Sequence, residues 1–146
     1  MKIKIAILIS LFSIILISGC SKEPAGKKFA GTYTVTDAWK STTVGSGNLA
    51  YDMMVVADGD DGIMLMNVNK TFSGVKAKVS GDEITVGSQM ISSNAGTKYQ
   101  INGYTGKLKD DKLDLKFVYS DVLFANAVGE VECTITGTKQ KTSSDK

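Results

Sequence analysis

From Phe29 onward, apolar residues recur at every second position of the chain. The pattern is clearest in Leu113, Leu115, Phe117 and Tyr119, which are separated by single residues. Successive side chains of a β-strand point to opposite faces, so this spacing predicts strands that bury one face. Together with a short apolar run, the pattern predicts about eight strands, over residues 32–36, 49–56, 63–66, 75–79, 84–86, 98–108, 113–119 and 130–136.

The segments between these strands are mostly short, and none of them has the pattern of an amphipathic helix. Residues 37–47 and 87–97 are longer and polar, so we expect loops there. Glycines within 98–108, Gly103 and Gly106, are expected to bend that strand. Antiparallel strands must protect their edges, and closure into a barrel removes the edges. We therefore predict an all-β fold, a single antiparallel up-and-down barrel of about eight strands; the alternative is a two-sheet β-sandwich.

The first twenty residues have a different composition from the rest. Lys2 and Lys4 precede an almost unbroken apolar run over residues 5–17, and small residues come directly before Cys20. This arrangement predicts a secretory signal. A transmembrane helix that stays in place is the alternative, but the apolar run is shorter than the ~20 residues that span a bilayer.

The sequence Ile17-Ser18-Gly19-Cys20 resembles the lipobox of bacterial lipoproteins. The resemblance implies cleavage before Cys20, which then carries a diacylglycerol and usually an amide-linked third acyl chain. Each buried methylene contributes roughly 0.8 kcal/mol, so several chains anchor the protein firmly. We expect a signal peptide over residues 1–19, a lipidated tether over 20–28, the barrel domain over 29–139 and a disordered tail over 140–146.

The residue after Cys20 bears on the location of the protein. Ser21 stands where an Asp is the usual signal that retains lipoproteins in the inner membrane. The sequence here resembles that of lipoproteins sent to the outer membrane. We therefore expect a lipid-anchored protein of the cell envelope, in the outer membrane, with the membrane as its first partner.

The absence of two residue types limits the chemistry open to the chain. It has 0 His, and all 17 basic residues are Lys. There is therefore no imidazole base, no Ser-His-Asp arrangement and no ordinary zinc site. The net charge of +2 is too small to indicate a nucleic-acid binder. We expect no enzymatic activity, no cofactor and no nucleic-acid partner.

Two further groups of residues have structural interpretations. Since Cys20 is assigned to lipid, Cys133 has no disulfide partner, and a free cysteine flanked by alternating apolar residues is expected in the core. Asp58, Asp60 and Asp61 could bind Ca²⁺, but they lack the spacing of an EF-hand loop. We expect them to form a solvated turn and predict no metal site.

Several segments together resemble small Bacteroidota lipoproteins with a lipocalin-like barrel domain. They are residues 29–35, 75–86, 88–89, 103–108 and 132–134. The resemblance implies a calycin-type barrel without an assigned activity. The chain departs from lipocalins proper, which have Gly-x-Trp in the first strand, because that tryptophan is replaced by a tyrosine and the usual arginine is missing.

Two regions are candidates for contact with a ligand or partner. Val122, Leu123 and Phe124 form an unusually apolar loop between two predicted strands, and Trp39 lies in a polar segment near one expected end of the barrel. These residues either fold over the barrel end as a lid or contact a ligand, a partner or the membrane.

Two functions fit this architecture. The first is an interaction or accessory module that contacts an envelope protein or a glycan; the alternative is a binding protein for a small apolar ligand inside the barrel. A cavity above ~300 Å³ would favour the ligand. The predicted inner residues are large, which favours a filled interior: Tyr33, Leu49, Tyr51, Met53, Tyr99, Leu115, Phe117 and Tyr119.

Lipidation of Cys20 is directly testable. In cells fed a labelled fatty acid, we expect the wild-type protein to incorporate label and the Cys20→Ala variant to incorporate none, because the acyl chains are attached through that sulfur. Cys133→Ala is the matched control and should label like wild type. Label on Cys20→Ala, or none on wild type, would contradict the lipoprotein assignment.

Overall fold

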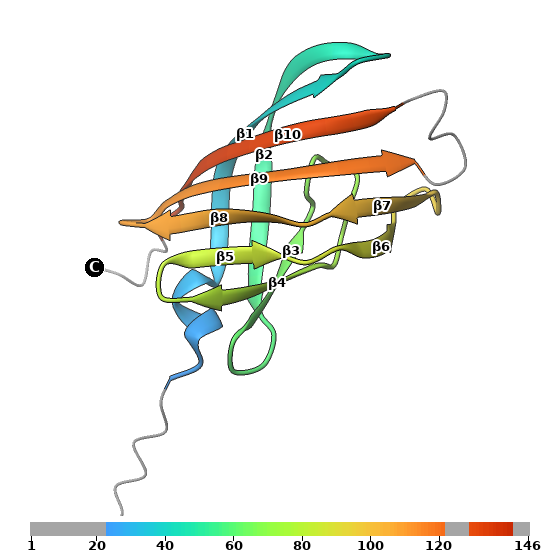
Figure 1. The fold of residues 1–146 in the computed structure, drawn as a ribbon. Coiled ribbons are helices and arrows are strands. Elements are labelled where there is room, and N and C mark those ends of the chain that lie inside the picture. Colours follow the sequence, from blue (N-terminus) through green and yellow to red (C-terminus); the bar gives the residue numbers. More distant parts are fainter. Residues whose placement is uncertain (1–22, 122–128, 142–146) are drawn as a thin grey trace, which may run out of the picture.

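The structure is a computed structural model that describes residues 23–121 and 129–141. A short 3-10 helix precedes ten antiparallel strands (Figure 1). The elements are η1 (Ala25–Phe29), β1 (Gly31–Ser41), β2 (Gly45–Ala57), β3 (Gly62–Met66), β4 (Val75–Ser80), β5 (Glu83–Val86), β6 (Gln89–Ser92), β7 (Lys98–Asn102), β8 (Tyr104–Lys109), β9 (Lys112–Asp121) and β10 (Glu130–Lys139).

Eight of the strands close into a barrel. β1 pairs with β2 on one side and with β10 on the other, and β10 pairs in turn with β9. The circuit is completed by β3, β4, β5 and β8. Each of these strands pairs with a neighbour on both sides, although β2 pairs with β3 only through Met54–Ala57. The predicted all-β barrel is confirmed, and the two-sheet sandwich is excluded.

Two further strands extend the barrel: β6, which the sequence did not predict, and β7, which is the first part of the strand predicted over residues 98–108. β9 pairs with β8 through Lys112–Leu115 and with β7 through Val118–Asp121, and β6 pairs with the outer side of β7. The prediction of a loop over residues 87–97 was wrong, since β6 lies within it. The predicted strand over 98–108 is divided at Gly103, where a Cβ atom would lie 2.6 Å from the Val86 carbonyl oxygen.

The expected loop over residues 37–47 was also wrong. β1 continues to Ser41 and β2 begins at Gly45, so these strands form a long hairpin that rises above the barrel (Figure 1). The pattern is obscured here because the inward positions include Asp37, Gly47 and Ser41 instead of aliphatic residues. Pairing of β1 with both of its neighbours keeps the backbone extended.

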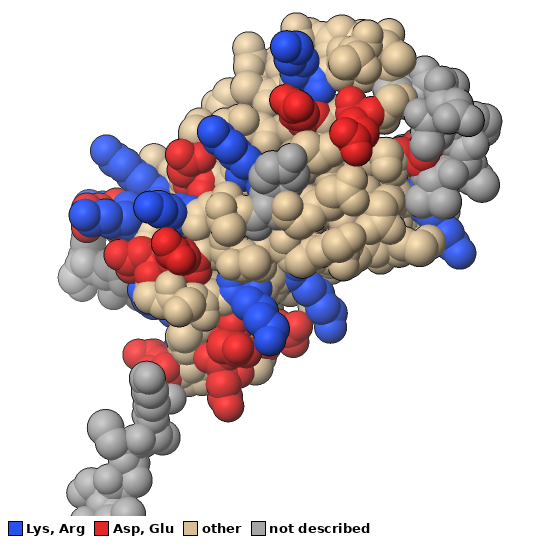
Figure 2. All heavy atoms as spheres, in the orientation of Figure 1, with Lys and Arg blue, Asp and Glu red and all other residues tan. Residues whose placement is uncertain are grey.

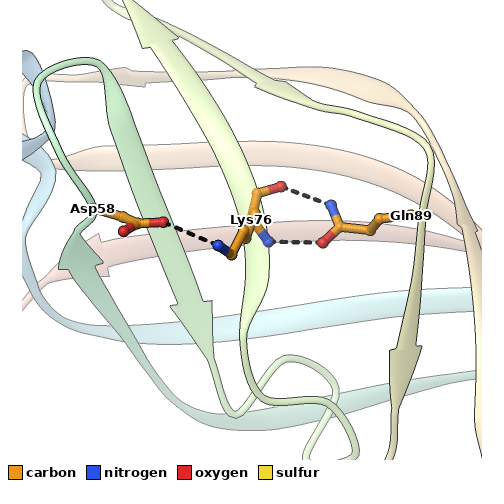
Figure 3. Close-up of polar contacts among 3 residues, drawn as sticks. All are labelled: Asp58, Lys76 and Gln89. Carbon is orange, nitrogen blue, oxygen red and sulfur yellow. Dashed lines mark hydrogen bonds and ion pairs between the residues drawn. The ribbon is translucent and has the colours of Figure 1, made fainter.

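The Gln89 side chain stabilises the point where the chain between β5 and β6 bends away from β4. The Lys76 backbone N–H donates to Oε1 of Gln89 at 2.9 Å, and Nε2 of Gln89 donates to the Lys76 carbonyl at 2.7 Å (Figure 3). The Gln89 amide thus replaces the strand backbone that β4 would otherwise pair with. It satisfies two ladder groups that the bend leaves without a strand partner.

One end of the barrel, which we call the base, is closed by η1. Phe29 is buried there, and the Tyr33 hydroxyl donates to its carbonyl at 2.8 Å. Residues 25–28, expected within the tether, therefore form part of η1 and pack on the barrel. The helix lies so close that a Cβ on Gly26 would overlap the Gly62 carbonyl oxygen.

The opposite end, which we call the mouth, is filled by residues 67–73 of the connection between β3 and β4. In this segment, the plug, Val68 and Phe72 are buried, and their backbones pair as a small antiparallel bridge. The Asn94 N–H donates to the Thr71 carbonyl at 3.0 Å, which joins the plug to the β6–β7 turn. Both barrel ends are thus covered, by unrelated segments.

The contact at the base predicts a specific sensitivity. We expect Gly26→Ala to lower the free energy of unfolding by about 1–3 kcal/mol, because the added methyl must push η1 off the Gly62 backbone. Gly87→Ala is the control, since nothing lies within 4 Å of its Cβ position. Urea denaturation of both variants measures the difference. Equal stabilities would contradict the packing at the base.

Candidate functional site at the barrel mouth

A carboxylate lies inside the barrel, below the plug. Asp37 continues the inward series of β1 after Tyr33 and Val35, and its exposed fraction is 0%. Neither of its carboxylate oxygens has a described residue in full hydrogen-bond geometry, although the Tyr51 hydroxyl and the Cys133 thiol are close enough to interact with it. Buried acids are normally paired, because removing an isolated charge from water is costly. This departure marks the interior around Asp37 as the candidate site.

The groups around Asp37 come from three other strands and from the plug. Tyr51 of β2 and Cys133 of β10 interact with the carboxyl, and Tyr119 of β9 is an electrostatic neighbour of both Asp37 and Cys133. Burial raises the pKa of Asp37 to about 6, and interactions with Cys133 and Tyr51 offset part of that rise. Asp37 therefore titrates near neutral pH, which is unusual for an aspartate.

Asn69 of the plug provides the polar contacts above the carboxylate. Its backbone N–H donates to the Tyr51 hydroxyl at 2.8 Å, and its side-chain Nδ2 donates to the Tyr119 hydroxyl at 3.1 Å. Nδ2 also lies 3.9 Å from Sγ of Cys133. A single residue of the plug thus contacts three of the groups that surround the site.

Aromatic residues form the walls of the mouth. Phe72 of the plug packs edge-to-face with Tyr99 at 5.0 Å and with Tyr119 at 4.8 Å between ring centroids. Trp39 is partly buried against the core, and its indole lies where a Cβ of Gly47 would be, at 2.9 Å. The glycine on β2 therefore makes room for the indole. The mouth combines polar hydroxyls with aromatic faces.

Cys133 is buried with an exposed fraction of 2%, which confirms the predicted core position. Burial is the main cause that raises the pKa of its thiol, and the neighbouring Asp37 raises it further. Because the thiolate is the nucleophilic form, a thiol in this environment is unreactive at neutral pH.

The other residues that the sequence singled out have different outcomes. Trp39 lies in β1 and not in a loop, and its contact with a ligand or partner stays a prediction, whereas Cys20 and Val122, Leu123 and Phe124 fall outside the described residues. Asp58 makes a 3.7 Å ion pair with Lys76, which Figure 3 shows. Within residues 23–121 and 129–141, no group of three or more His, Cys, Asp or Glu side chains is arranged to bind a metal.

The barrel interior is filled by side chains. Among the predicted inner residues, Tyr33, Tyr51, Met53, Leu115 and Phe117 are buried, while Leu49, Tyr99 and Tyr119 pack partly exposed against the core. Depressions occur on the outer surface, such as one of about 440 Å³ lined by Asp58, Lys76 and Gln89 among others. A ligand at this site must therefore bind at the mouth, where the plug now lies.

Comparisons with protein-family models, with curated proteins and with solved structures gave no match for this chain. No helix in the part of the chain that the structure describes is long and apolar enough to cross a membrane. The closed eight-strand barrel is compatible with a lipocalin-like fold.

Sequence analysis missed the two residues that matter most here, Asp37 and Asn69. Asp37 was placed in a loop, although the alternation of Tyr33 and Val35 reaches it if it is continued by two residues. An acid at an inward strand position was the available signal. Nothing in the local sequence of Asn69 indicates that it enters the mouth.

We expect Asp37→Asn to stabilise the protein at neutral pH. The pKa of Asp37 is about 6 in the folded state against an ordinary 3.8, so the folded state binds more protons in this window. The free energy of unfolding therefore falls as pH rises from the lower value to the higher, by up to ~3 kcal/mol. Above about 6 the destabilisation is complete, and the neutral amide avoids it.

Urea denaturation at about pH 4.5 and about pH 7.5 measures this effect. We expect the wild type to lose stability between the two values and Asp37→Asn to lose less. Asp114→Asn, which changes an exposed acid of β9, is the control and should keep the wild-type slope. A destabilised Asp37→Asn, or an unchanged slope, would show that the buried carboxylate is compensated.

Proposed function

We propose that this protein is a lipid-anchored binding module of the bacterial cell envelope, and that the mouth of its barrel receives a small ligand. Lipidation at Cys20, attachment to the outer membrane and the absence of catalysis are parts of the proposal. The sequence Ile17-Ser18-Gly19-Cys20 supports the anchor. The shielded thiol of Cys133 and the lack of histidine support a function other than catalysis.

The observation that carries the proposal is that the chain enters at one end of the barrel and the candidate site lies at the other. The chain enters at the base through η1, and the turns at residues 58–61, 81–82 and 110–111 lie at the same end. The candidate site lies at the other end, with the β1–β2 hairpin rising above it (Figure 1). An anchor before η1 would leave the mouth directed away from the membrane, on the side that a ligand in solution reaches.

The buried carboxylate of Asp37 also supports a ligand at the mouth, because the packing of the barrel does not require an acid at this position. A buried carboxylate whose polar neighbours, Tyr51 and Cys133, are both neutral is typical of a functional site. The face in Figure 2 has charges of both signs interspersed, so this face has no extended field of one sign. This supports a ligand read by local contacts instead of a nucleic acid.

A second candidate is interaction with an envelope protein or a glycan through the outer face of β2 and β3. Met54 is 46% and Val56 41% exposed there, and they pair across the strands with Met66 and Met64. Methionine side chains adapt to varied partner surfaces, and clustered exposed apolar groups often mark interfaces. This face is separate from the mouth.

Native mass spectrometry of the lipidated protein, purified from its own membranes, tests the proposal. We expect a small-molecule adduct on wild type and on the exposed control Val44→Ala, and its loss from Trp39→Ala, which removes a wall of the mouth. Wild type without an adduct, or an adduct that Trp39→Ala retains, would contradict a ligand at the mouth. A protein-mass adduct lost only from Met54→Lys would favour the second candidate.

A further inference from the structure

The carboxylate of Asp37 has no positively charged partner among the described residues. It is fully buried, and neither oxygen has a described residue in full hydrogen-bond geometry. The polar groups beside it, the Tyr51 hydroxyl and the Cys133 thiol, are neutral donors of the weaker kind. Chain cations are far more exposed: Lys40 on β1 and Lys70 of the plug both face solvent. The site therefore lacks a positive charge.

The plug already places a nitrogen donor in this part of the mouth. The Asn69 side-chain NH₂ group contacts the Tyr119 hydroxyl and lies near Sγ of Cys133, which is itself a neighbour of Asp37. This amide is a compact group with two N–H donors. A primary ammonium has a similar size, one more donor and the missing charge.

Three residues of the plug have left-handed backbone conformations. Asn67, Asn69 and Lys70 have φ angles of 60°, 51° and 53°, in the left-handed region that non-glycine residues seldom adopt. Asparagine tolerates this region, but lysine does so less readily. Strain of this kind persists where surrounding contacts impose it, and it is released when the segment leaves. The plug is therefore suited to give way to a competing group.

We propose that the mouth binds a small molecule with a primary ammonium group on an apolar body, and that the ammonium takes the place of the Asn69 amide and pairs with Asp37. This inference rests on the proposed function and specifies its ligand class. The apolar body would pack against the partly buried aromatic rings of the mouth, Trp39, Tyr99 and Tyr119. An anionic ligand would meet the carboxylate with like charge, so it is excluded.

The titratable groups around the carboxylate predict how binding depends on pH. Tyr51 faces Asp37 from β2, Tyr119 from β9 and Cys133 from β10, and burial raises the pKa of all three. They stay neutral below pH ~9. Asp37 is thus the group that changes charge near neutral pH, so affinity for an ammonium ion should increase as pH rises from about 5 to about 7.5.

Three probes that share a cyclohexyl ring test the proposal on the lipidated full-length protein in a non-ionic detergent. They are cyclohexylamine, cyclohexanol and cyclohexanecarboxylate, and the single Trp39 of the chain reports binding at the mouth by its fluorescence. We expect cyclohexylamine to bind at least ~10-fold more tightly than cyclohexanol, since charge-assisted hydrogen bonds are the stronger kind. The carboxylate should bind more weakly than either.

Two variants locate the interaction. Asp37→Asn keeps the shape of the side chain and should abolish the preference for the amine. Asn69→Gly removes the competing amide while glycine keeps the positive φ, so it should tighten cyclohexylamine binding several-fold. An Asp37→Asn variant that retains the preference, or an Asn69→Gly variant that binds the amine more weakly, would overturn the proposal.

The outcomes separate this inference from the proposed function. A native adduct without an amine, or cyclohexanol bound as tightly as cyclohexylamine, would overturn the ammonium assignment and leave a ligand at the mouth in place. The absence of any native adduct would overturn the proposed function, and with it the inference. Trp39 fluorescence that no probe changes would overturn the inference alone if the native adduct is present.

Discussion

The structure depends on the double pairing of β1. This strand is hydrogen-bonded to β2 along residues 31–41 and to β10 along residues 33–41, so it joins the two ends of the chain. Closure at this strand pairs both of its own edges, so neither edge of β1 is exposed to another chain. It also forces every inward side chain of β1 into a shared interior. Asp37 is buried because of this constraint, although its own chemistry favours water.

Closure leaves two open ends, and the chain covers them in different ways. The base is sealed by η1, with Phe29 and Tyr33 packed together and the helix in contact with the backbone of Gly62. The mouth is covered by the plug, whose contacts are polar as well as apolar and whose backbone includes three left-handed residues. The base is closed by close packing of η1, whereas the plug is held in part by hydrogen bonds of Asn69 that another donor could replace.

Asp37 is an unfavourable residue for the packing of the barrel. A hydrophobic residue at position 37 would fit the alternation of β1 and avoid a buried charge. Burial instead raises the pKa of the Asp37 carboxyl, which lies beside tyrosines and a thiol whose pKa values burial also raises. The cost is tolerable because the rest of the interior is filled by well-packed side chains such as Met53, Leu65 and Leu115. We read the carboxylate as a site for a cationic group.

The sequence by itself determined the class of fold, because a period of two can bury one face only in strands, and it also indicated Cys133 as a core residue. The prediction of a loop over residues 37–47 was wrong for a physical reason. Asp37 and Gly47 do not continue an apolar pattern, yet pairing with neighbouring strands holds them in β1 and β2. Only the tertiary structure decided that Asn69, from a distant connection, meets Tyr51, Tyr119 and Cys133. Such a site depends on contacts between residues 18 to 64 positions apart, and no local propensity encodes these contacts.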